Sequence, residues 1–261
     1  MARVIAVTNQ KGGVGKTTTC VNLAASLAAT KRRVLLVDMD PQGNATMGSG
    51  VDKNALELSG YDMLTKRASA AEVIIPAEAS GFDILPANGD LTAAEVELMN
   101  EIGREHRLRL ALNTVRDNYD YILIDCPPSL SLLTVNALSA ADSVLIPMQC
   151  EYYALEGLAA LMNTVEQIQE TVNPNLQVEG ILRTMYDPRN SLTLDVSGQL
   201  SEYFGDKVYR AVIPRNVRLA EAPSYGVPAL KYDRASKGAI AYLALAGEIL
   251  RREDARMAEA V

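Results

Sequence analysis

Residues 8–19 read TNQKGGVGKTTT, a glycine-rich stretch directly after a short apolar run, RVIAVTN at 3–9. Phosphate-binding loops follow the pattern G-x-x-x-x-G-K-[ST]. Gly15, Lys16 and Thr17 fill its last three positions, whereas Gln10 stands where the first glycine belongs. Lys11 comes next, at a position for which the pattern has no requirement. A loop that already has one lysine needs no second, so the rest of the chain must explain Lys11.

Short apolar, β-branched runs alternate with longer helical patterns along almost the whole chain. Several runs are nearly continuous in apolar residues, which is typical of strands covered on both faces. The sequence therefore predicts an α/β fold: one doubly wound, mostly parallel sheet with helices on both faces, forming a single domain over 1–261. We expect strands at 3–9, 33–40, 82–87, 121–127, 143–149, 178–185 and 208–214, and helices at 17–30, about 91–117, 130–141, 154–172, 192–204 and 236–256.

The composition is that of an ordinary globular protein, with 48% hydrophobic and 22% charged residues. Cys20, Cys126 and Cys150 fit neither a disulfide framework nor a metal-ligand spacing, so we expect a reduced, cytoplasmic protein. The apolar stretches do not have the pattern of a signal peptide or a membrane span. The net charge of −7 argues against a generally basic nucleic-acid coat, although residues 183–237 hold nine Lys/Arg against six Asp/Glu.

Polar residues follow four of the expected strands, at 10–18, 38–44, 125–129 and 214–218. Ligands of open parallel sheets bind beyond the carboxyl ends of the strands. We therefore expect these four segments to converge on one site.

The glycine loop has the features of a phosphate site. Gly12, Gly13 and Gly15 let the backbone turn tightly so that its N–H groups face an anion, and the dipole of the following helix adds to the attraction. By the motif, Lys16 reaches the β- and γ-phosphates and the Thr17 hydroxyl is a ligand of Mg²⁺. The loop is predicted to bind phosphate.

Three aspartates follow two of the strands. Asp125 ends the strand YILID, at the place of a Walker-B carboxylate that holds Mg²⁺ through water, although a helix cap or a turn would also use an aspartate there. Asp38 and Asp40 lie two residues apart and so on the same side of an extended chain, where like charges resist joint ionisation unless a cation is near. His106, the single histidine, lies in a charged run, REHRLRL, and is interpreted as a surface residue rather than a base.

Three motifs in order, KGGVGKTT at 11–18, VDMDPQGN at 37–44 and IDCPPS at 124–129, resemble the deviant Walker motifs of the ParA/MinD ATPases. Two later segments, RTMYDPRN at 183–190 and IPRNVRLAEAPSYG at 213–226, are similar to those of Soj-type chromosomal ParA proteins. The resemblance covers essentially the whole chain. It implies a Mg²⁺-dependent ATP hydrolase with ATP and Mg²⁺ as cofactors.

The resemblance also explains Lys11. In the family this is the signature lysine, which crosses the interface of an ATP-bound homodimer to the phosphates held by the other subunit, much as an arginine finger acts in trans. The resemblance implies that Asp40 positions the attacking water and that Asp38 helps to hold the Mg²⁺ shell. The implied catalytic residues are Lys11, Lys16 and Asp40, and the implied metal residues are Thr17, Asp38 and Asp125.

The resemblance implies a nucleotide site that extends beyond the loop, with the last four of its residues against the adenine: Lys11, Gly12, Gly13, Val14, Gly15, Lys16, Thr17, Thr18, Met185, Pro214, Arg215 and Asn216. The family binds double-stranded DNA without sequence preference as the ATP dimer, and Arg189 and Arg218 match its DNA-binding positions. A ParB-like centromere-binding protein is the implied partner, and the nucleoid the implied location.

Four other classes of protein are alternatives to a Soj-type ParA protein, and each can be recognised by a particular feature. A MinD-like membrane ATPase needs a C-terminal amphipathic helix with bulky apolar residues, but the last ten residues, REDARMAEAV, offer only Met257 and Val261. A nitrogenase-type reductase needs paired cluster cysteines, and Cys126 is better interpreted as a small buried residue. Carboxysome-positioning relatives lack the signature lysine present as Lys11. A phosphoryl-transfer enzyme of the dethiobiotin synthetase kind would require a small-molecule acceptor and ignore DNA.

Overall fold

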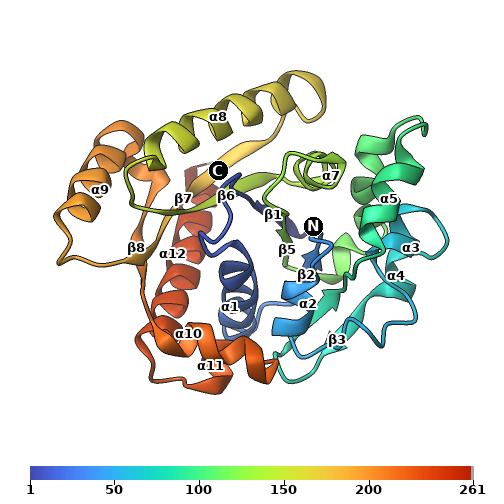
Figure 1. The fold of residues 1–261 in the computed structure, drawn as a ribbon, viewed down its shortest axis with the longest axis horizontal. Helices are drawn as coiled ribbons and strands as arrows, with labels where there is room; N and C mark the ends of the chain where they lie inside the picture. The colour runs from blue at the N-terminus through green and yellow to red at the C-terminus, as the bar shows by residue number, and fades with distance from the viewer. Residues whose placement is uncertain (260–261) are drawn as a thin grey trace.

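The strands of the computed structural model, which describes residues 1–259, form one eight-stranded sheet in the order β3-β4-β2-β5-β1-β6-β7-β8 (Figure 1). Only the β3–β4 pair is antiparallel, and the other neighbouring pairs are parallel. The prediction of a mostly parallel sheet is confirmed. The strands are β1 (Arg3–Val7), β2 (Val34–Asp38), β3 (Ile75–Ala77), β4 (Phe82–Leu85), β5 (Tyr121–Asp125), β6 (Ser143–Gln149), β7 (Gln177–Tyr186) and β8 (Val208–Pro214).

Helices cover both faces of this sheet, as predicted. Side chains of β1 alternate between two apolar cores: Val4 and Ala6 belong to one, and Ile5 and Val7 to the other. The Ile5 side is closed by α1 (Lys16–Ala29) and α12 (Lys237–Glu259), and Figure 1 shows these two helices together on one side of the sheet. The opposite face is covered by α5 (Leu91–Leu98), α6 (Arg107–Asn113), α7 (Leu132–Ala140), α8 (Ala154–Thr171) and α9 (Ser191–Phe204).

The prediction of one helix over about 91–117 is wrong. The chain instead forms α5, the 3-10 turn η1 (Arg104–His106), α6 and the 3-10 turn η2 (Arg116–Asn118). Gly103 takes a left-handed conformation with φ of 68°, which interrupts a helix and is accessible to glycine at low cost.

Several short elements were not predicted because each is shorter than the pattern that sequence periodicity needs. β3 has only three residues and contains Pro76, which an edge strand tolerates. The others are α2 (Asn44–Gly48), α3 (Gly60–Leu64), α4 (Ala70–Val73), η3 (Gly205–Lys207), α10 (Val217–Glu221), η4 (Ala222–Tyr225) and α11 (Ala229–Tyr232).

No helix within residues 1–259 is long and apolar enough to cross a lipid bilayer. Of the two apolar residues considered for a membrane-binding C-terminus, Met257 is exposed on α12. Val261 lies outside the described residues.

A buried carboxylate ties several elements together where the strands begin. Glu179 of β7 forms ion pairs with Arg3 of β1 and with Arg256 of α12, the latter at 3.1 Å. It also accepts hydrogen bonds from the hydroxyls of Tyr209 at 3.0 Å and Ser143 at 2.9 Å. Burial by itself would raise the pKa of Glu179, but the two arginines outweigh it and hold that pKa below its usual value.

We predict that Glu179→Gln lowers the free energy of unfolding by about 3 kcal/mol, because it leaves the largely buried guanidinium group of Arg3 without its counter-charge. Urea denaturation at neutral pH measures the change. Glu97→Gln is the matched control, since Glu97 pairs with Arg67 at the surface and its loss is expected to cost less than about 1 kcal/mol. Equal losses in the two variants would show that the Glu179 cluster contributes no more than a surface pair.

Candidate nucleotide-binding site

The loop between β1 and α1 presents backbone donors rather than side chains. Gly13 and Gly15 have φ angles of 74° and 89°, in the left-handed region that glycine adopts readily. Gly15 is also the N-cap of α1, and no side chain caps the first N–H groups of that helix. These N–H groups are unsatisfied within the helix and point to where an anion would bind.

Lys16 begins α1 and is buried behind the loop, with 8% of its surface exposed. Its Nζ donates to the backbone carbonyl of Lys11 at 3.2 Å. Burial lowers the pKa of Lys16, and the nearby Asp125 carboxylate partly offsets this effect. A phosphate in the loop would give this ammonium group the counter-charge that its burial requires.

Asp38 and Asp125 end neighbouring strands and are direct partners in the β2–β5 register. Asp38 accepts hydrogen bonds from the N–H and hydroxyl of Thr46 at 2.8 and 2.7 Å and from the N–H of Asp40 at 3.1 Å. Burial nevertheless raises the pKa of Asp38 to about 6. Burial, followed by the charge of Asp38, raises the pKa of Asp125 to about 8. Two buried carboxylates so close together resist joint ionisation unless a cation joins them.

The residues present fit a magnesium ion that takes the rest of its ligands from phosphate and water. Oδ2 of Asp125 is buried and has no hydrogen-bond partner within the described residues. Thr17 lies close enough to Asp125 for its hydroxyl to lower the pKa of that carboxyl group. Residues 1–259 contain no group of three or more His, Cys, Asp or Glu that would hold a metal ion unaided. Mg²⁺ binds in this manner at phosphate sites, through one or two protein ligands.

Asp40 and Lys11 lie at the rim of the site and are lightly held. Asp40 is half-buried, and its Oδ1 accepts a hydrogen bond from the N–H of Gln42 at 2.9 Å. Lys11 forms an ion pair with Glu151 at 2.6 Å, in which the two side chains are 52% and 44% exposed. Surface pairs of this kind contribute little to stability, so a stronger counter-charge can displace Glu151.

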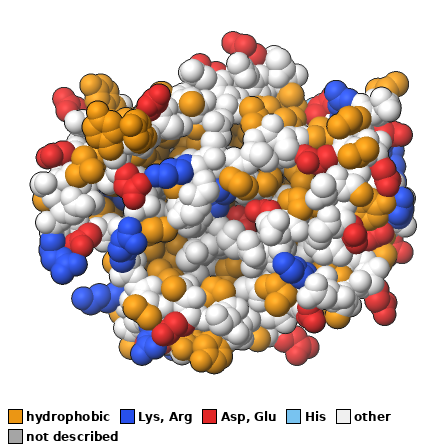
Figure 2. All heavy atoms as spheres, in the orientation of Figure 1, with side chains coloured by type: hydrophobic (Ala, Val, Ile, Leu, Met, Phe, Trp, Pro, Cys, Tyr) orange, Lys and Arg blue, Asp and Glu red, His pale blue; other side chains and the backbone are white. Residues whose placement is uncertain are grey.

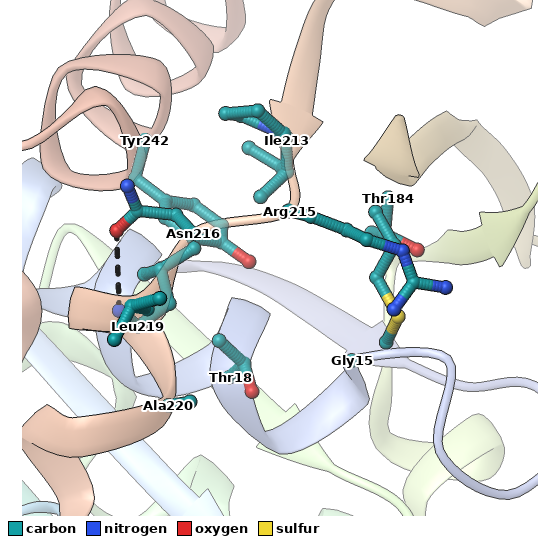
Figure 3. Close-up of a pocket in the computed structure, with 12 residues that line it drawn as sticks. Gly15, Thr18, Thr184, Ile213, Arg215, Asn216, Leu219, Ala220 and Tyr242 are labelled. Atoms are coloured by element: carbon teal, nitrogen blue, oxygen red, sulfur yellow. Dashed lines mark hydrogen bonds between the residues drawn. The ribbon is translucent and has the colours of Figure 1, made fainter. Parts of the chain in front are cut away.

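A pocket of about 400 Å³ adjoins the loop (Figure 3). Gly15 and Thr18 of the loop region line it, together with the four residues that the resemblance places against the adenine: Met185, Pro214, Arg215 and Asn216. Figure 3 shows Arg215 extending from the end of β8 toward Thr184 of β7. Oδ1 of Asn216 accepts the N–H of Leu219 at 3.3 Å and so caps α10. The structure therefore places all four residues beside the phosphate loop.

Sequence reasoning missed half of this pocket. Tyr242 comes from α12, and its hydroxyl lies 3.1 Å from that of Thr19 on α1. No local pattern links a tyrosine in the last helix to a loop near residue 15. Proximity in sequence to Met185 and to 214–216 was the available signal for the other residues. The missed lining residues are Thr184, Ile213, Val217, Leu219, Ala220 and Tyr242.

Arg189 and Arg218 lie outside the loop, and each has acidic partners nearby. Arg189 is 88% exposed and makes two hydrogen bonds to Asp187, at 2.9 and 2.8 Å. Arg218 pairs with Glu221 at 2.7 Å and with Asp233 at 3.3 Å. Figure 2 shows Lys and Arg side chains gathering at the lower left, around the part of the molecule where Figure 1 places β8 and α10. The carboxylates that pair with Arg189 and Arg218 make this region less positive than its arginines alone suggest.

A glycine loop between a central parallel strand and a helix, facing two carboxylates on neighbouring strands, defines a P-loop nucleotide-binding protein. The family model described as an AAA domain matches residues 2–178. The sporulation initiation inhibitor protein Soj of Bacillus subtilis is 56% identical, over 95% of this chain and 98% of its own. The chromosome partitioning protein ParA of Caulobacter vibrioides is 51% identical, over 99% of this chain and 97% of its own. The chain belongs to the ParA/MinD family of P-loop ATPases, which confirms the resemblance of its motifs.

Among solved structures, the fold matches a cobyrinic acid a,c-diamide synthase from Mycobacterium smegmatis with bound ATP analog and magnesium. The TM-score is 0.85 and the identity 38%, over 97% of this chain and 96% of the other. This neighbour carries a nucleotide and the metal that the sequence predicted as cofactors.

Proposed function

We propose that this protein is a ParA-type partitioning ATPase in which residues 1–261 act as one P-loop domain. It binds ATP and Mg²⁺, forms a homodimer around the nucleotide, binds double-stranded DNA without sequence preference and is reset by hydrolysis. A ParB-like protein stimulates that hydrolysis. The observation that carries this proposal is Lys11. It is an additional, exposed lysine on a loop in which Lys16 is already buried at the phosphate position.

The nucleotide is held from three directions in this proposal. The loop N–H groups and Lys16 bind the phosphates, while Thr17, Asp38 and Asp125 hold Mg²⁺ directly or through water. The pocket lined by Met185, Pro214, Arg215 and Asn216 takes the adenine. Asp40 lies at the rim, next to the carboxylate that anchors the metal, and orients the attacking water.

Lys11 acts on the nucleotide of the facing subunit. In a single chain its ammonium group pairs with Glu151 at the surface. The γ-phosphate of a facing ATP is a stronger partner because it carries more negative charge at a less solvated position. ADP lacks that phosphate, so the ADP state has less holding the two subunits together.

Dimerisation also supplies the switch for DNA. The basic region around Arg189 and Arg218 is modest in one chain, because Asp187, Glu221 and Asp233 neutralise part of it. Two such regions on one dimer double the number of phosphate contacts. The slope of log K for DNA binding against log salt concentration then becomes steeper by roughly 0.9 for each added phosphate contact. We place the working protein in the cytoplasm, on the nucleoid.

The partitioning proteins support this proposal more strongly than the synthase does. Their identity to this chain is 51–56%, against 38% for the synthase, at similar coverage. A synthase would also need its acid substrate for turnover and would be indifferent to DNA. Nucleotide-dependent DNA binding separates the two.

Lys11→Ala is predicted to bind ATP with nearly unchanged affinity and to lose ATP-dependent dimerisation. Removing the Lys11 side chain leaves the loop backbone and Lys16 in place, so the substitution removes contacts between the subunits rather than contacts to the bound ATP. Light scattering coupled to size exclusion measures the dimer, and a fluorescent ATP analogue measures binding. Glu151→Gln is the control, because it removes the partner of Lys11 and keeps the lysine. A Lys11→Ala protein that still dimerises on ATP would remove Lys11 from the interface.

Asp40→Ala is predicted to bind ATP, to dimerise and to lose at least tenfold in hydrolysis rate. Within the described residues the Asp40 carboxylate accepts one hydrogen bond, from Gln42, so its main role is to orient the attacking water. Phosphate release under saturating ATP gives the rate. Asp52→Ala, an exposed aspartate outside the site, serves as the control. Turnover equal to that of the unmodified protein would exclude Asp40 from the chemistry.

Fluorescence anisotropy of a random-sequence DNA duplex tests the proposal as a whole. We expect salt-sensitive binding with Mg-ATP and at least tenfold weaker binding with Mg-ADP. Arg189→Glu combined with Arg218→Glu is predicted to abolish DNA binding while ATP-dependent dimerisation remains. Arg32→Glu combined with Arg67→Glu, two charge reversals at exposed positions elsewhere on the surface, is the control for net charge. Binding that is the same in both nucleotides would break the proposed link, and turnover would then be assayed with small acid acceptors.

A further inference from the structure

A second pocket, of about 570 Å³ and with a polar lining, lies at the amino ends of β1, β6 and β7, away from the phosphate loop. Its lining includes Ser143 and Gln177, the first residues of β6 and β7. We call it the arginine pocket because four arginines line it: Arg3 of β1, Arg109 of α6, Arg116 of η2 and Arg256 of α12.

Positive charge exceeds negative charge in the arginine pocket. Asp142 is the carboxylate in its lining, and Glu179 lies beside it as the shared partner of Arg3 and Arg256. Four arginines against these two carboxylates leave a formal charge of +2. Small-molecule sites commonly have volumes of this order, with a few convergent polar groups that fix the ligand.

Two of the guanidinium groups have unused donors. Nη1 of Arg3 is buried and has no hydrogen-bond partner within the described residues. Arg109 has neither an ion-pair partner nor a hydrogen-bond acceptor among residues 1–259. Because Arg109 is only partly buried, its N–H donors are open to an anion that enters the pocket.

We propose that the arginine pocket binds a small oxyanion of two or more negative charges, of the phosphate or pyrophosphate class. Guanidinium groups match the geometry of such oxygens through paired N–H donors. Arg109 supplies the unpaired donors, Arg3 adds positive charge in the lining, and Arg116 is fixed by Asp142 at 2.5 Å and by the carbonyl of Ala2 at 2.9 Å. This site is separate from the nucleotide site and does not depend on the proposed partitioning function.

The positions of the arginines favour a small anion over a nucleic-acid duplex. The Arg3 and Arg116 side chains are only 13% and 22% exposed. Their carboxylate partners hold them within the pocket, so they cannot extend to the phosphates of a duplex lying across the surface.

Isothermal titration with pyrophosphate, without nucleotide or magnesium, tests this proposal. The phosphate loop is a second place for pyrophosphate, so the unmodified protein is expected to show two sites. Lys16→Ala is expected to remove the loop site, and Arg109→Gln is expected to weaken the other at least tenfold. Arg32→Gln, an exposed arginine outside the pocket, has the same change in charge and is expected to retain both sites. Arg109→Lys is expected to bind pyrophosphate with an affinity between those of the unmodified protein and Arg109→Gln, because lysine retains the charge but lacks the paired N–H donors of the guanidinium group.

The outcomes separate this site from the proposed function. If Lys16→Ala changes nothing and Arg109→Gln still abolishes binding, the arginine pocket stands and the loop assignment fails. Loss of all binding in Lys16→Ala alone overturns the arginine pocket. Weak binding that Arg32→Gln and Arg109→Gln reduce equally shows an adventitious ion only and overturns it as well. Thermal unfolding by circular dichroism verifies that each variant is folded.

Discussion

The in-register pairing of β2 with β5 puts two carboxylates side by side in a buried place, and much of the site follows from the need to balance their charge. Asp38 is balanced internally, since Thr46 gives it both an N–H and a hydroxyl. The same hydroxyl accepts the N–H of Ala87 at 2.9 Å, which fixes Asp38 to the segment after β4. Within residues 1–259, Oδ2 of Asp125 has no such partner. Asp38 is therefore partly balanced by the chain itself, whereas Asp125 depends more strongly on a cation.

Beside these two carboxylates, the phosphate loop carries positive charge that is also unbalanced. Lys16 is buried with a lowered pKa, and the N–H groups at the start of α1 lack acceptors. A metal ion alone would satisfy Asp125 and leave Lys16 unbalanced, while a phosphate alone would do the reverse. A phosphate together with a divalent cation balances both, because the two ligands also neutralise one another. Co-binding of nucleotide and metal thus follows from the arrangement of charge.

Sequence reasoning succeeded where the controlling information is local. The buried strands β1, β2, β5 and β6 are continuous apolar runs, so their positions were predicted to within two residues, and the phosphate loop follows from the spacing of its own residues. It failed at 91–117, where helical periodicity continues across Gly103 although the backbone there is left-handed. The pocket beside the loop needs Tyr242, which only the packing of α12 on α1 brings near. Of the acidic partners of Arg218, Glu221 is only three residues away, whereas Asp233 follows α11 and is brought near Arg218 by the fold.

The two ends of the strands carry different kinds of charge. At the carboxyl ends, backbone donors, a lysine and carboxylates are arranged for a ligand, as is usual in parallel sheets. At the amino ends, Arg3 and Arg256 share Glu179 as their ion-pair partner, whereas Arg109 has no ion pair within the described residues. Three elements have residues at both sites: β1 runs from Arg3 to the phosphate loop, and β7 runs from Gln177 to Met185. The third, α12, carries Tyr242 and Arg256, roughly 21 Å apart along its axis. Coupling between the two sites can therefore act through β1, β7 and α12.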